Sequence, residues 1–141
     1  MAVGIEKRRQ VLIVDDERII TDTLVTIFSQ HGYETKGVYS AEQALALLED
    51  WHPDLVVIDV LLPAMNGIDL AIRMKSQWPE CRVSLFSGQA ATTDLLELAM
   101  KRGHTFDVLA KPVHPTELLD MAERLLGESR ISISTKIEVA L

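Results

Sequence analysis

The chain has 141 residues, a length typical of one compact domain, and 48% of them are hydrophobic and 25% charged. This balance is that of a globular protein and not of a disordered chain. The formal net charge of −7 argues against a general nucleic-acid-binding function, which relies on neutralising phosphates. No apolar run reaches the roughly 20 residues that span a bilayer. We therefore expect a cytoplasmic protein without membrane insertion.

Four short apolar runs are predicted to form buried strands. None of them alternates with polar residues, and continuous apolar strands are typical of a parallel sheet covered on both faces. They lie at residues 11–14, 55–58, 83–86 and 108–110. A more polar segment, 33–39, is predicted to be an edge strand.

Segments with helical periodicity separate these strands. Gly32 follows the first of them as a C-terminal stop, and Ser40 with Gln43 forms a capping box at the start of the second. Pro115 suits the first position of the last helix, which is expected to end at Gly127. The predicted helices lie at 19–28, 40–51, 67–77, about 92–99 and 115–127.

Five alternating strands and helices predict a doubly wound α/β fold with a five-stranded parallel sheet. We expect this domain to span residues 9–127, after a lead-in at 1–8. Residues 128–141 are interpreted as an extra strand, a partner-binding arm or a disordered end. In such folds the ligand chemistry lies at the carboxyl edge of the sheet.

Reactive side chains follow each of the four apolar strands. Asp15 and Asp16 follow the first, Asp59 the second, Ser87 the third and Lys111 the fourth. Clustered carboxylates suit Mg²⁺, which prefers hard oxygen ligands. A carboxylate can also attack phosphorus, while a lysine and a hydroxyl hold phosphoryl oxygens. The pattern therefore favours reversible phosphorylation of an aspartate.

The single cysteine, Cys81, excludes an intrachain disulfide and a cysteine-based zinc site.

The order of these motifs resembles a known family. The segments are VLIVDDE at 11–17, LVVIDVLLPAMNG at 55–67, LFSG at 85–88 and AKP at 110–112. Together they resemble the response-regulator receiver domain of two-component signalling, of the single-domain chemotaxis-regulator type. The resemblance implies a (βα)5 flavodoxin-like receiver fold.

The resemblance also implies a role for each matching residue. Asp59 would be the phosphoacceptor, and Mg²⁺ would be the cofactor. Asp16 would bind the metal directly, Asp15 would bind it through water, and Asp59 and the Leu61 backbone carbonyl would add further ligands.

Three more positions match the phosphoryl-binding side of the family's site. Ser87 stands at the switch position, which holds threonine or serine, and Lys111 at the invariant lysine. Pro112 stands at the usual cis-peptide position, since proline is the residue for which cis is cheap.

The sequence departs from the family pattern at some positions. Val108 stands where the family often has a rotating switch aromatic, so output could work differently or through Phe106. Leu61 and Gln89 stand at the positions that tune phosphoryl lifetime. Because an apolar Leu61 cannot orient a water molecule, we expect slow self-hydrolysis.

The resemblance predicts a phosphoacceptor module and not an enzyme that turns over external substrates. A sensor histidine kinase or phosphotransfer protein would supply the phosphoryl group, and a downstream output protein would read the changed surface. We expect no direct contact with nucleic acid. Homodimerisation could use the face formed by the fourth helix, fifth strand and fifth helix. No output domain is expected after the fifth helix, so the chain would be stand-alone, a relay intermediate or an excised receiver.

Two other hypotheses stay open from the sequence. The first is an aspartyl-phosphate phosphatase or phosphotransferase of the haloacid-dehalogenase type, although the adjacent aspartates do not form that family's motif. The second is a receiver that is never phosphorylated and works by dimerisation.

Overall fold

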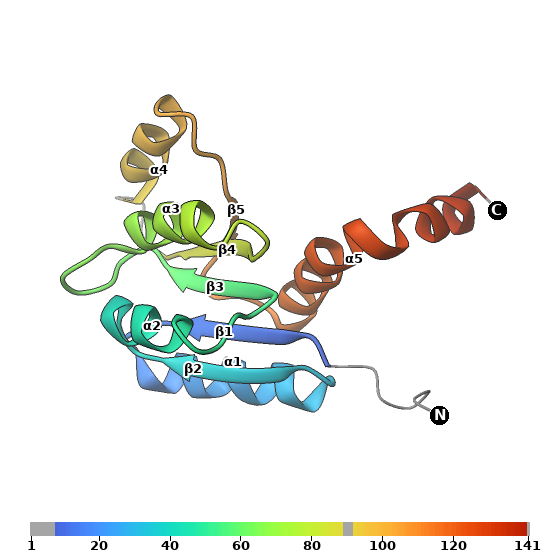
Figure 1. The fold of residues 1–141 in the computed structure, drawn as a ribbon, viewed down its shortest axis with the longest axis horizontal. Coiled ribbons are helices and arrows are strands. Elements are labelled where there is room, and N and C mark those ends of the chain that lie inside the picture. The colour runs from blue at the N-terminus through green and yellow to red at the C-terminus, as the bar shows by residue number, and fades with distance from the viewer. Residues whose placement is uncertain (1–7, 89–91, 141) are drawn as a thin grey trace.

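The computed structural model describes residues 8–88 and 92–140, and the side chains of residues 8–88 and 93–127. Within this part of the chain, strands and helices alternate from end to end (Figure 1). The elements are β1 (Gln10–Val14), α1 (Arg18–Gln30), β2 (Glu34–Val38), α2 (Ala41–Leu48), β3 (Leu55–Asp59), α3 (Gly67–Gln77), β4 (Arg82–Ser87), α4 (Thr92–Lys101), β5 (Asp107–Ala110) and α5 (Pro115–Ala140). The predicted alternation of strand and helix is confirmed.

The strands form one parallel sheet in the order β2-β1-β3-β4-β5. The chain moves outward from β1 to β2 and then returns to β3 on the other side of β1. This change of direction puts the switch point of the sheet between β1 and β3. The register pairs Val14 with Ile58, so Asp15 and Asp59 follow at the same level.

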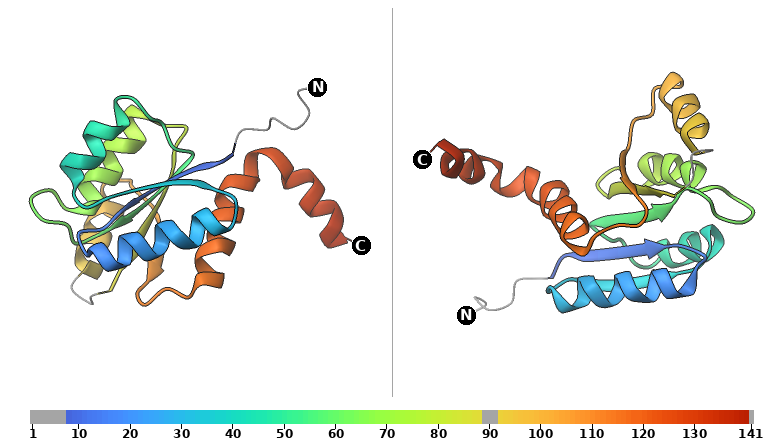
Figure 2. Two further views of the ribbon diagram at one scale, coloured as in Figure 1. Left: turned by 90° about the horizontal axis from the view of Figure 1, so that it is seen from below. Right: turned by 180° about the vertical axis from the view of Figure 1, so that it is seen from behind.

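Two helical layers cover the sheet (Figure 2). Leu12 and Val14 of β1 pack on one face with α2, α3 and α4, whereas Val11 and Ile13 pack on the other face with α1 and α5. All four side chains are completely buried. Residues 11–14 of β1 and 55–58 of β3 are all apolar and buried, and carboxylates follow directly at the ends of these two strands.

The two edge strands differ from the buried centre. The predicted edge strand at 33–39 is confirmed by β2, whose residues are exposed or half-buried. The prediction of a buried strand at 108–110 is wrong. β5 is the opposite edge strand, its residues alternate between half-buried and exposed, and Val108 is 43% exposed.

The helix ends confirm one glycine stop and contradict another. Gly32 has a φ of +91° and follows the end of α1, as predicted. α5 instead continues through Gly127 to Ala140, so the predicted helix end at Gly127 and the extra strand after it are wrong. The described non-helical glycines with positive φ are Gly32 and Gly103. A glycine stops a helix by adopting that conformation, and inside a helix it costs only about 1 kcal/mol.

The start of α2 follows the predicted capping box in part. The Gln43 backbone N–H donates to the Ser40 hydroxyl at 3.1 Å, whereas the Gln43 side-chain oxygen accepts from the Tyr39 N–H at 2.9 Å. Among the described residues, no helix is both long enough and apolar enough to cross a membrane.

Candidate functional site

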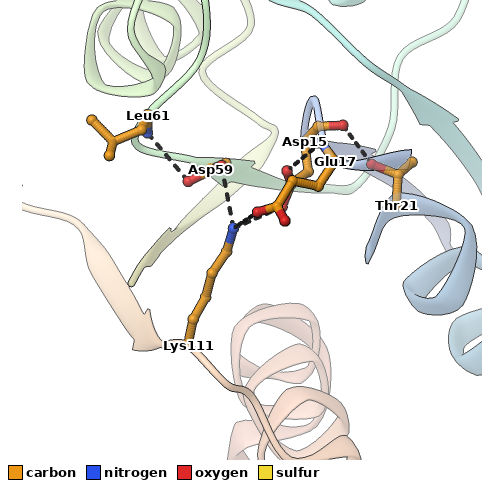
Figure 3. A network of polar contacts seen from close by, with 6 residues as sticks. All are labelled: Asp15, Glu17, Thr21, Asp59, Leu61 and Lys111. Carbon is orange, nitrogen blue, oxygen red and sulfur yellow. Dashed lines mark hydrogen bonds and ion pairs between the residues drawn. The ribbon is translucent and has the colours of Figure 1, made fainter. Parts of the chain in front are cut away.

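The carboxyl edge of the sheet brings residues from distant parts of the chain together (Figure 3). The Lys111 ammonium reaches from the end of β5 to the ends of β1 and β3. Its Nζ lies 2.9 Å from Asp15 Oδ2 and 3.2 Å from Asp59 Oδ2. It also lies 3.6 Å from Glu17 Oε1. One cation therefore neutralises part of the charge of three carboxylates.

Each polar group of Asp15 has a hydrogen-bond or ion-pair partner. Its side chain is completely buried, and Oδ1 accepts the Glu17 backbone N–H at 2.9 Å. Its backbone N–H donates to the Val38 carbonyl of β2 at 3.3 Å, and its own carbonyl accepts the buried Thr21 hydroxyl at 2.7 Å. A buried carboxylate needs such partners because isolated charges are costly inside a protein.

Asp59 occupies the end of the central strand β3, and 8% of its side chain is exposed. Burial, and next the negative charge of Asp15, raise the pKa of the Asp59 carboxyl to about 6. The Lys111 charge and the Leu61 N–H, which donates to Asp59 Oδ1 at 3.2 Å, act in the opposite direction. The carboxylate is therefore poorly solvated, and it is ionised at neutral pH with Lys111 as its counter-ion.

Gly67 allows the chain to pass close behind Asp59. Its N–H donates to the Val60 carbonyl at 2.8 Å, and a Cβ at this position would collide with the Asp59 backbone carbonyl. The loop after β3 can therefore fold back against the phosphoacceptor candidate only with glycine at its end.

Lys111 is oriented by its surroundings as well as by charge. Burial disfavours its ammonium, but the hydrogen bond to Asp15 and the charges of Asp59 and Asp15 outweigh burial and raise its pKa. Its Nζ lies 5.7 Å from the centre of the Phe86 ring, and its backbone N–H donates to the Ser87 carbonyl at 3.1 Å. The Lys111–Pro112 peptide bond is cis, as the resemblance implied.

The carboxylates at this edge are suited to a divalent cation. Oxygens of Asp15, Glu17 and Asp59 lie within 4.8 Å of one another. Hard carboxylate oxygens at this spacing fit Mg²⁺, which is bound by one or two carboxylates and otherwise by waters and phosphate oxygens. Asp16 is exposed and lines the adjacent cavity, but it is not part of this group of three. Its role as a direct metal ligand stays a prediction.

A cavity of about 710 Å³ opens in front of these groups. Polar side chains, among them Asp59 and Lys111, line one part of it, and apolar side chains of α1, among them Ile20 and Leu24, line another. Asp59 therefore faces a space large enough for a phosphoryl group and the group that delivers it.

Three further predicted residues are described by the structure. Ser87 ends β4 beside Lys111, to which it is linked through the backbone. Leu61 lines the cavity, and Val108 lies on the exposed face of β5. Gln89 lies outside the described residues.

Sequence reasoning missed two residues of this site. Glu17 adds a third carboxylate, and Thr21 fixes the Asp15 carbonyl from the second turn of α1. The acidic run at residues 15–17 could have suggested Glu17. A threonine on an amphipathic helix gives no comparable signal.

A family model for the response regulator receiver domain matches residues 11–123. The chain belongs to the response-regulator receiver family. The predicted family and the five-stranded receiver fold are thereby confirmed. Receiver domains of this family are modules of two-component signalling.

Relatives and solved structures agree with this assignment. The DNA-binding response regulator MtrA of Mycobacterium tuberculosis is 32% identical over 114 residues, which are 79% of this chain and 48% of MtrA. The regulatory protein AtoC of Escherichia coli is 35% identical over 117 residues, 83% of this chain and 25% of AtoC. A CheY-like receiver domain from Methanospirillum hungatei superimposes with a TM-score of 0.78 at 28% identity, covering 86% of this chain and 96% of that one. The chain thus spans about half the length of MtrA, and less of AtoC.

Proposed function

We propose that the chain is a phosphoacceptor module in which Asp59 receives a phosphoryl group from a histidine kinase, a phosphotransfer protein or a small phosphodonor. The observation that carries this proposal is the setting of Asp59. It is a buried carboxylate at the end of the central strand, 3.2 Å from the Lys111 ammonium and open to a cavity. A surface aspartate with a merely structural role has no need of such a setting.

In the proposed transfer, an Asp59 carboxylate oxygen attacks phosphorus and forms an O–P bond. The bond from phosphorus to the donor's imidazole nitrogen breaks, and the imidazole leaves with its electron pair. Asp15, Asp16, Asp59 and the Leu61 carbonyl would hold Mg²⁺, which would supply positive charge to the phosphoryl oxygens. Lys111 holds a further phosphoryl oxygen, and Ser87 can hydrogen-bond another.

Phosphorylation then changes the surface that the domain presents. The phosphoryl group draws Lys111 and Ser87 inward, and this biases a pre-existing equilibrium between two arrangements of the face formed by α4, β5 and α5. Val108 stands in place of a switch aromatic on that face, which offers it to an output protein or to a second copy of the chain. Leu61, together with Gln89, would lengthen the lifetime of the phosphorylated state.

We propose that the domain promotes only its own phosphorylation and dephosphorylation, without turning over external substrates. Its net charge of −7 favours a protein as the partner of this surface over direct contact with nucleic acid. The family assignment removes the haloacid-dehalogenase alternative.

The test is to incubate the protein with MgCl₂ and acetyl phosphate and to measure its intact mass. We expect the mass of one phosphoryl group, labile to hydroxylamine, mapped to Asp59 and absent from Asp59→Asn. A matched control is Asp54→Asn, because Asp54 lies at the amino end of the same strand, where it accepts the Gln10 N–H at 2.8 Å. This variant should still be phosphorylated.

An absent adduct in the wild-type protein, with acetyl phosphate and with a phosphorylated histidine kinase, would contradict the proposal. That result would favour the receiver that works unphosphorylated by dimerisation. An adduct that persists in Asp59→Asn would contradict the choice of acceptor.

A further inference from the structure

Glu17 is a carboxylate in contact with Lys111 to which the proposed function gives no role. Its backbone N–H is fixed by Asp15 Oδ1 at 2.9 Å, and its carboxylate lies 3.6 Å from the Lys111 ammonium. It differs from its neighbours in exposure, because 63% of the Glu17 side chain is exposed, against none of Asp15 and 8% of Asp59. Glu17 is therefore the outermost of the three carboxylates that contact Lys111.

Glu17 places a negative charge in the cavity that Asp59 faces. Glu17 and Asp16 line the same cavity as Asp59 and Lys111. The site holds more carboxylates than the single ammonium of Lys111 can balance, and Glu17 shares that ammonium with Asp15 and Asp59. An anionic donor that enters the cavity thus meets an excess of negative charge at its mouth.

We infer that Glu17 is a specificity-determining residue that selects phosphodonors by charge, disfavouring small, highly anionic donors relative to less charged ones. The inference rests on the proposed function, since it concerns the donor from which Asp59 takes its phosphoryl group. Donors that carry phosphorus on an imidazole bear less negative charge than acyl phosphates. The charge of Glu17 therefore favours transfer from a protein phosphohistidine.

The size of the effect follows from Coulomb's law. In water, one unit charge about 7 Å from another changes an association constant by about threefold. Removing the charge of Glu17 should therefore speed phosphorylation by a factor that grows with donor charge. We expect about threefold for a monoanion and about ninefold for a dianion at low ionic strength.

The experiment compares wild type with Glu17→Gln, which keeps the size of the side chain and removes its charge. The second-order rate constant of phosphorylation is measured at saturating MgCl₂ and neutral pH with acetyl phosphate, a dianion, and with phosphoramidate, a monoanion. Glu80→Gln is the matched control, because Glu80 is exposed and immediately precedes Cys81 and β4, at the opposite edge of the sheet. It should change each rate less than twofold.

A larger gain with acetyl phosphate than with phosphoramidate supports the inference. The gain must also shrink in about 1 M salt, where the Debye length falls to about 3 Å from about 30 Å at 0.01 M. Equal effects on both donors, a slower reaction in Glu17→Gln, or an effect independent of salt would each overturn it.

Titration calorimetry with MgCl₂ in the absence of any donor separates charge selection from metal binding. A charge that lies near the metal without binding it should alter the affinity for Mg²⁺ less than about tenfold. A larger loss of Mg²⁺ affinity in Glu17→Gln would make Glu17 a metal ligand and overturn the inference.

If wild type takes no phosphoryl group from either donor, both the proposed function and this inference fail. If wild type is phosphorylated on Asp59 without the donor-dependent gain in Glu17→Gln, the inference alone fails.

Discussion

The ionised carboxylate of Asp59 lowers the free energy of unfolding, because the group is buried beside another carboxylate. Its carboxyl has a pKa of about 6 in the folded chain, against an ordinary value of 3.8. Below pH 3.8 the group is protonated in both the folded and the unfolded chain. As the pH rises from 3.8 to 6, the folded chain retains the proton that the unfolded chain has lost, so the free energy of unfolding falls through this window.

We therefore predict that Asp59→Asn stabilises the metal-free protein at pH 7.5, by about 1–3 kcal/mol. The advantage should shrink as the pH is lowered to 4. Urea unfolding in EDTA at several pH values measures it, with Asp50→Asn, an exposed aspartate after α2, as the control. An Asn variant less stable than wild type at pH 7.5 would show that the ion pair with Lys111 outweighs the burial of the carboxylate.

A second prediction concerns Thr21, whose hydroxyl is the hydrogen-bond donor to the buried Asp15 carbonyl. Thr21→Val keeps the shape of the side chain and leaves that carbonyl without this donor, which should cost about 1–3 kcal/mol of unfolding free energy. Thr21→Ser keeps the hydroxyl and should lose less. Urea unfolding of both variants is the measurement. A larger loss in Thr21→Ser than in Thr21→Val would attribute the effect of Thr21 to packing of its methyl group.

At the scale of elements, the turn into α3 depends on one close approach. Gly67→Ala would place a methyl group against the Asp59 backbone carbonyl, and the turn must shift to relieve the collision. We predict a loss on the order of 2–4 kcal/mol in unfolding free energy and slower phosphorylation of Asp59. Gly32→Ala is the control, because Gly32 has open space around it and only its positive φ opposes the substitution. That variant should lose stability but be phosphorylated at the normal rate.

Strand ends were the most predictable feature of this chain. Asp15, Asp59 and Lys111 could be grouped from the sequence because parallel strands deliver their last residues to a common edge. The exposure of Val108 could not be predicted, since it depends on the position of β5 in the sheet. A run of three apolar residues looks the same in a central strand and in an edge strand.

The contacts that cross between elements were the least predictable. The ion pair of Glu17 with Lys111 depends on the turn that Asp15 Oδ1 stabilises, and the bond from Thr21 depends on how α1 docks on β1. The continuation of α5 through Gly127 was missed because glycine was read as a stop, although its effect depends on the φ that it adopts.

For the whole molecule, Lys111 links the edge strand β5, which it follows, to Asp15 and Asp59 at the ends of the central strands. We predict that Lys111→Ala still accepts a phosphoryl group on Asp59 but loses the response of the face formed by α4, β5 and α5. Amide hydrogen exchange of residues 92–110, with and without acetyl phosphate, measures that response. A phosphorylation-dependent change of equal size in wild type and Lys111→Ala would contradict the coupling.

Lys111 directly follows β5, which pairs with β4 at four positions and lies at the edge of the sheet. A protein that binds β5 therefore restricts the position of the Lys111 ammonium. Binding and phosphorylation are then coupled reciprocally. If phosphorylation of Asp59 raises the affinity for this binding protein by some factor, the bound protein raises the equilibrium constant for phosphorylation by the same factor. At a fixed kinase activity, an abundant binder of β5 would increase the fraction of chains that carry phosphate, so that the receiving protein partly sets the strength of its own signal.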